Sequence, residues 1–108
     1  MAALMTSEAS FSIGQTIHHR LFDYRGVIVD VDPFFSGSED WYHTIAQSRP
    51  PKDQPWYRVL VDGGEQMTYV AQRNLEDDAS GEPIHHRALP QFFRGFQDGV
   101  YIPNRRMN

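Results

Sequence analysis

Apolar and polar residues alternate in the first third of the chain, as is typical of strands buried on one face. In residues 13–21 the apolar side chains share one face: Ile13, Ile17 and Leu21. In residues 27–32 valines alternate with Ile28 and two aspartates. A polar segment between these runs has turn composition, with Gly26 expected at a positive φ. Residues 13–32 are therefore predicted to form an antiparallel hairpin, which Pro33 ends because proline lacks a backbone donor.

A second pair of alternating runs covers Trp56–Val61 and Gln66–Ala71. Between them stands Asp62-Gly63-Gly64, a strong hairpin signal. The second run is expected to leave the sheet through a short 3₁₀ turn at residues 71–75, followed by an acidic loop over Glu76–Pro83.

Residues 34–55 form an unusually long connection, which includes Pro50, Pro51 and Pro55. Connections of this length in a compact domain are usually functional or mobile. We expect a helical turn near Glu39–Ile45 and mobility in Arg49–Gln54.

The C-terminal third has the least regular pattern. Three phenylalanines at helical spacing predict one helical turn: Phe92, Phe93 and Phe96. Val100–Ile102 is expected to be a closing strand. Because closure removes exposed sheet edges, we predict a mostly β fold, a small SH3-like barrel of about five antiparallel strands with a long loop and short helical turns.

Length and composition indicate one domain. The 108 residues divide into a flexible tail at 1–10, a β-barrel domain at 11–103 and a basic tail at 104–108. The chain has no cysteine, so disulfides and thiolate sites are excluded. The N-terminus has no secretory signal pattern and no apolar run is long enough to span a bilayer, so a cytoplasmic protein is expected.

The net charge of −4 is unevenly distributed. Residues 28–82 hold four basic and eleven acidic groups, a net charge of −7, whereas residues 83–108 hold four basic groups and one acidic group, a net charge of +3. Tight binding to a phosphate backbone needs several converging cations. If the protein binds duplex DNA, the contacts are therefore expected from the C-terminal arginines: Arg87, Arg94, Arg105 and Arg106.

No residue pattern predicts catalysis, a metal or a cofactor. The adjacent histidines His18-His19 point to opposite faces of a strand and cannot share one metal without a bulge. Asp30 and Asp32 share a strand face, with Asp62 expected beside them, but no nucleophile or oxyanion hole accompanies them. We therefore expect a binding protein that is not an enzyme.

Aromatic residues cluster around two turns, and such groups can stack on bases or grip a peptide. The candidates for protein contacts are Phe35, Trp41, Tyr42 and Trp56. Trp56, on the strand face opposite Tyr57, is also a candidate interface for self-association, because a chain this short does not bury all its aromatics.

Six segments taken together resemble the HspQ family, also described as YccV-like or hemimethylated-DNA-binding domain proteins. They are FSIGQ at 11–15, YRGVIVDVDP at 24–33, SEDW at 38–41, QPWYRVLVDG at 54–63, TYVA at 68–71 and NL at 74–75. The resemblance implies a heat-shock-induced β-barrel protein of the bacterial cytoplasm that self-associates as a trimer.

Two functions follow from the resemblance. The first is to promote degradation of denatured or regulatory proteins, including the replication initiator, as a specificity factor for the Lon protease. The alternative is binding of hemimethylated DNA at the replication origin. The signature positions are expected to be structural: Gly14, Gly26, Asp30, Asp32, Pro33, Trp56, Tyr57 and Tyr69.

Overall fold

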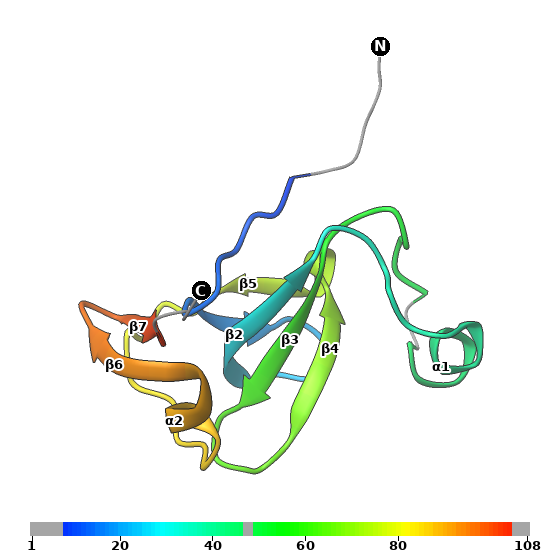
Figure 1. The fold of residues 1–108 in the computed structure, drawn as a ribbon. Coiled ribbons are helices and arrows are strands. Elements are labelled where there is room, and N and C mark those ends of the chain that lie inside the picture. Colours follow the sequence, from blue (N-terminus) through cyan, green and yellow to red (C-terminus); the bar gives the residue numbers. More distant parts are fainter. Residues whose placement is uncertain (1–7, 47–48, 105–108) are drawn as a thin grey trace.

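Strands dominate the computed structural model, which describes residues 8–46 and 49–104 (Figure 1). In chain order the elements are β1 (Thr16–His19), β2 (Arg25–Asp32), α1 (Glu39–Ile45), β3 (Trp56–Val61), β4 (Met67–Ala71), the 3₁₀ helix η1 (Gln72–Asn74), β5 (Leu75–Asp77), α2 (Leu89–Phe92), β6 (Phe93–Gln97) and β7 (Val100–Pro103). The predicted mostly β class is confirmed. No helix among the described residues has the length and apolarity to cross a membrane.

The main sheet has five antiparallel strands in the order β4-β3-β2-β1-β5. Its two edge strands are consecutive in the chain, because β4 runs through η1 directly into β5. β6 and β7 form a separate hairpin. Figure 1 shows this hairpin and α2 on one side of β2, β3 and β4, with α1 on the opposite side.

The first predicted hairpin is present, but its details differ from the prediction. β1 is short, and Ile13 and Leu21 at its flanks are 42% and 56% exposed. Gly26 lies inside β2, opposite Val61, and does not have a positive φ; in the turn that conformation belongs to Asp23, at φ 57°. Glycine is needed at this position because the backbone of β2 lies very close to β3. A β carbon on residue 26 would lie 2.6 Å from the Leu60 carbonyl oxygen.

The second hairpin is confirmed. β3 has the predicted bounds, β4 begins one residue later than expected, and Gly63 in the turn has φ +85°. η1 takes the place of the predicted 3₁₀ turn. The acidic segment after it is not wholly a loop, because Glu76 and Asp77 belong to β5, which pairs with β1.

Both faces of β2 and β3 are buried. On one face a core cluster joins Ile17, Ile28, Tyr57, Val59, Val70 and Leu75. On the other face Val27, Val29 and Leu60 pack against the C-terminal residues Ile84, Phe93 and Tyr101. Successive side chains of a strand point to opposite faces, so a continuous apolar run such as Val27–Val29 fits a strand that is covered on both sides.

The C-terminal third therefore acts as a cover for the sheet. The helical turn lies at α2, earlier than predicted, because Phe93 and Phe96 belong to β6. The rings of Phe93 and Tyr101 lie 5.3 Å apart and are fixed by this hairpin. The strand expected at residues 100–102 is present as β7, but it pairs with β6 and not with a strand of the main sheet; its one β-bridge to the N-terminal part joins Gln15 and Val100.

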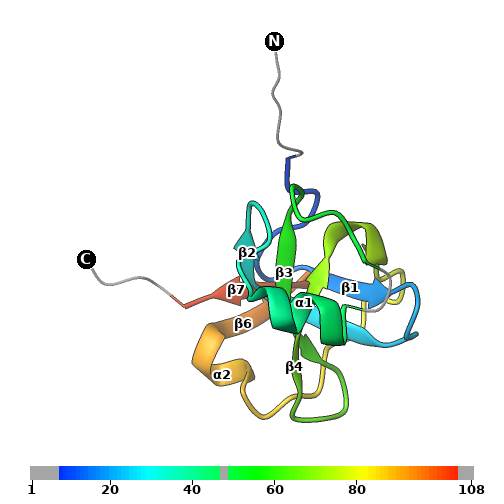
Figure 2. The ribbon, with the colours of Figure 1, turned by 90° about the vertical axis from the view of Figure 1, so that its right-hand side faces the viewer.

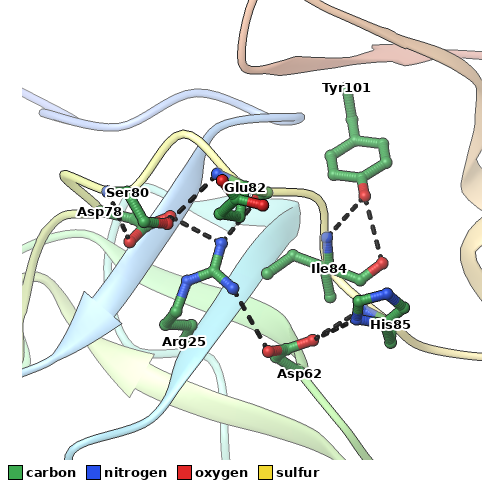
Figure 3. A network of polar contacts seen from close by, with 8 residues as sticks. All are labelled: Arg25, Asp62, Asp78, Ser80, Glu82, Ile84, His85 and Tyr101. Carbon is green, nitrogen blue, oxygen red and sulfur yellow. Dashed lines mark hydrogen bonds and ion pairs between the residues drawn. The ribbon is translucent and has the colours of Figure 1, made fainter.

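A polar network centred on Arg25 holds this cover in place (Figure 3). The guanidinium donates to Asp62 Oδ2 at 3.3 Å, to Asp78 Oδ2 at 2.8 Å and to the Glu82 carbonyl at 2.6 Å. Burial raises the pKa of Asp78, but hydrogen bonds from Arg25 and Ser80 outweigh it and leave the pKa below its ordinary value. The segment between β5 and α2 is thereby fixed to β2 and β3.

Two further contacts complete the attachment. The Tyr101 hydroxyl accepts from the Ile84 amide at 2.8 Å and donates to the Ile84 carbonyl at 3.2 Å. The Tyr101 amide donates to the Gly14 carbonyl at 2.8 Å. Gly14, at φ +96°, could not carry a β carbon, because that atom would collide with the Tyr101 carbonyl oxygen. The glycine expected to be structural is therefore required for this close approach.

The long connection folds back onto the sheet. Its predicted helical turn is α1, which Ser38 caps by accepting a hydrogen bond from the Trp41 amide at 3.0 Å. Three carbonyls of the later segment are hydrogen-bonded: that of Pro50 by the Tyr42 hydroxyl, that of Pro51 by Trp56 Nε1 and that of Lys52 by the Phe35 amide. The mobility expected for Arg49–Gln54 stays a prediction.

Substitution of Gly26 tests the close packing of β2 on β3. We expect Gly26→Val to lower the free energy of unfolding by about 1–3 kcal/mol, the usual cost of overpacking, because the new β carbon would lie 2.5 Å from Val59 Cγ1 and 2.6 Å from a backbone oxygen. Gly37→Val is the control, since its β carbon meets the ring of the half-buried Phe35, which can shift. Urea unfolding of both variants gives the comparison, and equal midpoints would contradict it.

Candidate functional site

A groove of about 350 Å³ lies along the edge of the sheet formed by β4. We call it the β4 groove. One wall comes from α1 and the residues that follow it: Trp41, Ile45, Ala46 and Pro50. The other wall comes from the connection between β1 and β2: Leu21, Phe22 and Tyr24. Figure 2 shows α1 in front of β3 and β4.

The aromatic residues predicted to make protein contacts come together beside this groove. The ring of Phe35 lies 4.9 Å from that of Trp56 and 6.0 Å from that of Trp41, and Tyr42 packs in the same cluster. Two of the four candidates have little surface to offer a partner, because Tyr42 is buried and Trp56 is 1% exposed. Trp41 is half-buried and lines the groove, so it remains the best placed of the four to touch a partner.

One arginine and two aspartates form a compact charged group around Tyr69, beside the aromatic cluster. The Tyr69 hydroxyl donates to Asp32 at 2.6 Å, and the Arg58 guanidinium lies 4.7 Å from the centre of the Tyr69 ring. Arg58 also contacts Asp32 at 3.1 Å and Asp30 at 3.4 Å. Burial, together with the Asp32 carboxylate, raises the pKa of Tyr69 to about 12.

The position of Asp62 differs from the prediction, and the groove lining carries little charge. Asp62 does not lie beside Asp30 and Asp32; it pairs with Arg25 at the other end of β3. Among the described residues that line the groove, Arg58 alone is formally charged, and it is paired with Asp30 and Asp32, which do not line the groove. The lining is therefore mostly apolar and has no unpaired charge.

His19 shapes the second wall. Its Nδ1 accepts hydrogen bonds from the amides of Leu21 and Phe22, both at 3.1 Å, and its ring stacks on Phe22 with 4.8 Å between centres. Leu21 and Phe22 are thereby held with 56% and 60% of their surfaces exposed. The neighbouring His18 contacts Asp23 and Glu76 at 2.7 Å each, which fixes the base of the same turn.

The pKa values of the two histidines are shifted in opposite directions. Burial, and then the neighbouring His18, lowers the pKa of His19. Hydrogen bonds to Asp23 and then to Glu76 raise the pKa of His18. A protonated His19 could no longer accept at Nδ1, so the wall formed by Leu21 and Phe22 depends on the neutral ring.

Sequence reasoning did not identify three residues that line the groove: Leu21, Ile45 and Met67. Leu21 was assigned to a buried strand face, and the other two were treated as ordinary members of a helical turn and a strand. The signal that could have found Leu21 is the pair Leu21-Phe22 directly before a turn, where large apolar side chains have little strand left to cover them.

The predicted DNA contacts are only partly within the described residues. Arg87 forms an ion pair with Glu65 at 2.9 Å, and Arg94 is exposed on β6. Arg105 and Arg106 lie outside the described residues. Elsewhere carboxylates pair with Arg20, Arg25, Lys52 and Arg58. Within residues 8–46 and 49–104, no group of three His, Asp or Glu side chains is placed to hold a metal ion.

The pH dependence of unfolding tests the role of His19. Its pKa is lower in the folded state than its ordinary value of about 6.5, so its contribution to stability is present above that pH and lost as the pH falls through the folded pKa. We expect His19→Gln to lose less free energy of unfolding between pH 7.5 and pH 5 than the wild type loses. Urea titrations at the two pH values measure this.

His18→Gln is the matched control with the opposite sign. The raised pKa of His18 means that its contribution is present below about pH 6.5 and lost as the pH rises through the folded pKa. This variant should lose more stability at pH 5 than the wild type. A His19→Gln variant with the pH dependence of the wild type would refute the assignment.

One comparison with known proteins bears on this site. The family model described as "Hemimethylated DNA-binding protein YccV like" matches residues 9–100. The match includes every strand of the five-stranded sheet, α1 and both walls of the β4 groove. Since it extends over most of the chain, the protein belongs to the YccV-like family.

Proposed function

We propose that this protein is a non-enzymatic heat-shock factor that binds apolar segments of denatured or regulatory proteins and promotes their degradation as a specificity factor for the Lon protease. The β4 groove is the observation that carries the proposal. Its rim exposes four large apolar side chains: Leu21, Phe22, Ile45 and Met67. Exposed apolar groups gathered around a groove are typical of a surface that binds another protein.

The distribution of charge favours a protein partner over a phosphate backbone. Five of the basic residues in the described part of the chain are held by carboxylates: Arg20, Arg25, Lys52, Arg58 and Arg87. A phosphate contact by any of them must compete with that carboxylate. The net charge of −4 adds long-range repulsion of nucleic acid.

A degradation assay tests the proposal directly. Purified Lon and ATP are incubated with a reduced, carboxymethylated polypeptide that cannot refold, with and without this protein. We expect the wild type to raise the initial rate of degradation several-fold. We expect Leu21→Ser combined with Phe22→Ser to remove most of this increase, because the two substitutions delete the apolar rim of one wall.

Ile13→Ser is the matched control for this assay. Ile13 is also apolar and exposed, but it does not line the β4 groove, so its variant should stimulate degradation as the wild type does. Either no stimulation by the wild type or equal stimulation by the double variant would contradict the proposal.

Binding of hemimethylated DNA is the second candidate, and the description of the matching family favours it. The cations available for it remain Arg87, Arg94, Arg105 and Arg106, as predicted from the charge distribution. Four phosphate contacts would give a slope of at most about −3.6 in log K against log salt. The ion pair between Arg87 and Glu65 would reduce this further.

Titration of the quadruple Arg→Gln variant tests this candidate. Hemimethylated and unmethylated duplexes are compared at two salt concentrations. We expect weak, salt-dependent binding by the wild type, with a dissociation constant in the micromolar range or above, and none by the variant. Tight or salt-insensitive binding, or binding that survives in the variant, would exclude the C-terminal arginines as the site.

The remaining expectations concern the state of the protein in the cell. We propose a cytoplasmic protein that self-associates, as a trimer by family resemblance. Trp56 does not supply the interface, because its side chain is buried within the chain. Sedimentation that shows a 12.5 kDa species alone at micromolar concentration would contradict self-association.

A further inference from the structure

β4 forms an edge of the main sheet and has a paired strand on one side only, β3. An edge strand presents backbone donors and acceptors that can bind an additional strand. The β4 groove lies along this edge and is lined by five consecutive residues, Met67 to Ala71. The groove therefore contains backbone hydrogen-bonding groups as well as apolar side chains.

The register identifies which backbone groups face outward. The Val61 amide donates to the Gln66 carbonyl and the Gln72 amide donates to the Pro55 carbonyl, each at 3.0 Å. Hydrogen-bonded positions alternate along an antiparallel pair, so residues 66, 68, 70 and 72 bond to β3. The amides and carbonyls of Met67 and Tyr69 point away from β3, and in the described part of the chain no hydrogen bond to them is found.

The side chains of β4 continue both walls of the groove. Tyr69 packs with Trp41 and Trp56 on the side of α1. On the opposite face the Thr68 hydroxyl lies 2.7 Å from the Tyr24 hydroxyl, beside the connection between β1 and β2. A strand added to β4 would thus place alternate side chains against α1 and against that connection.

We propose that the β4 groove binds an extended, uncharged apolar segment of an unfolded polypeptide as an additional strand on β4. The main-chain groups of Met67 and Tyr69 would bond to the backbone of the segment, and the two walls would hold its alternate side chains. The identity of the segment, as part of a protein destined for degradation, rests on the proposed function. The mode of binding, as a strand added to β4, is independent of it.

The lack of unpaired charge in the groove favours an uncharged occupant. The single formally charged residue that lines it, Arg58, is already paired with Asp30 and Asp32, which lie outside the lining. The titratable ring in the wall, His19, has a pKa below its ordinary value because of burial. Placing a charged side chain here would leave it without a partner at a cost in desolvation, whereas an apolar side chain avoids that cost.

The walls also favour a single chain over a second copy of this protein. The groove is bounded by α1 on one side of β4 and by Leu21 and Phe22 on the other. A second copy that approached with its own β4 would bring the same two walls to the same place. An isolated extended segment has no such walls and fits between them.

A labelled peptide tests the mode of binding. The probe is a fluorescein-labelled heptapeptide of alternating threonine and valine, titrated with the full chain by fluorescence anisotropy. One comparison peptide carries N-methyl groups on every amide, which keeps the side chains and removes the donors. Another has aspartate in place of valine. We expect both to bind at least about tenfold more weakly than the parent, the loss expected for a buried hydrogen bond or charge left unpaired.

Met67→Pro gives the matching change on the protein. The Met67 amide faces outward, so proline removes a donor from the free edge without breaking the pairing with β3. Met67→Ala is the reference, because it also removes the apolar side chain but keeps the amide. We expect Met67→Pro to bind the parent peptide about tenfold more weakly than Met67→Ala does, with circular dichroism melts confirming that both are folded.

Three results would overturn the proposal: no binding of the parent peptide at 1 mM, equal binding of the N-methylated peptide, or a self-associated wild type that Met67→Pro converts to a monomer. In the last case a second copy would occupy β4. Should Met67→Pro fail to fold, the N-methylated peptide still decides. Peptide binding without stimulation of Lon would refute the proposed function alone. Stimulation of Lon by the wild type together with equal binding of the N-methylated peptide would refute the added strand alone.

Discussion

The need to cover both faces of β2 and β3 determines where the other elements lie. Val27, Ile28, Val59 and Leu60 are all fully buried, although they alternate between the two faces. One face is covered by curvature of the sheet itself, through β1, β4 and β5. The other is covered by the C-terminal segment with α2, β6 and β7. Arg25 fixes this cover by binding Asp62, Asp78 and the Glu82 carbonyl.

The same constraint leaves β4 open. α1 is placed by packing of Tyr42, Phe35 and Trp41 against Trp56 at the end of β3, so it stands beside β4 without pairing with it. The C-terminal cover packs on the opposite face of the sheet. It contacts the turn before β4 through His86 and Gln66, but none of its described residues lines the β4 groove. An unpaired strand between two apolar walls is the result, and the function that we propose depends on it. Ion pairing within the chain also favours a protein partner over nucleic acid, because most of the described arginines and the lysine that pair with carboxylates would have to give up that contact to bind a phosphate.

The sequence predicted the fold class and the strands with strong alternation. The bounds of β3, the pairing within both hairpins, α1 and the 3₁₀ turn follow from local patterns and from prolines and glycines at turns. Gly26 was misplaced because turn composition resembles that of a strand packed tightly against its neighbour. The C-terminal third was misread because Phe93 and Tyr101 are fixed by contacts with Val27, Val29 and Leu60, which are distant in sequence.

The candidate site was harder to predict than the fold. Sequence reasoning identified Trp41 and its aromatic neighbours, but it could not show that Trp56 and Tyr42 are buried by their own cluster. The groove is made by Leu21, Ile45 and Met67, which come from three separate segments, and only the register of β4 reveals which amides face outward. The charge distribution indicated where free cations remain but not which of them pair with carboxylates.

Amide hydrogen exchange of β4, measured by NMR with and without a saturating unfolded polypeptide, tests the central claim most directly. Met67 and Tyr69 have outward-facing amides, whereas Thr68 and Val70 are bonded to β3 and serve as internal controls. The account predicts that exchange at Met67 and Tyr69 slows when the polypeptide binds, while exchange at Thr68 and Val70 changes little. Binding of the polypeptide with unchanged exchange at Met67 and Tyr69 would contradict it.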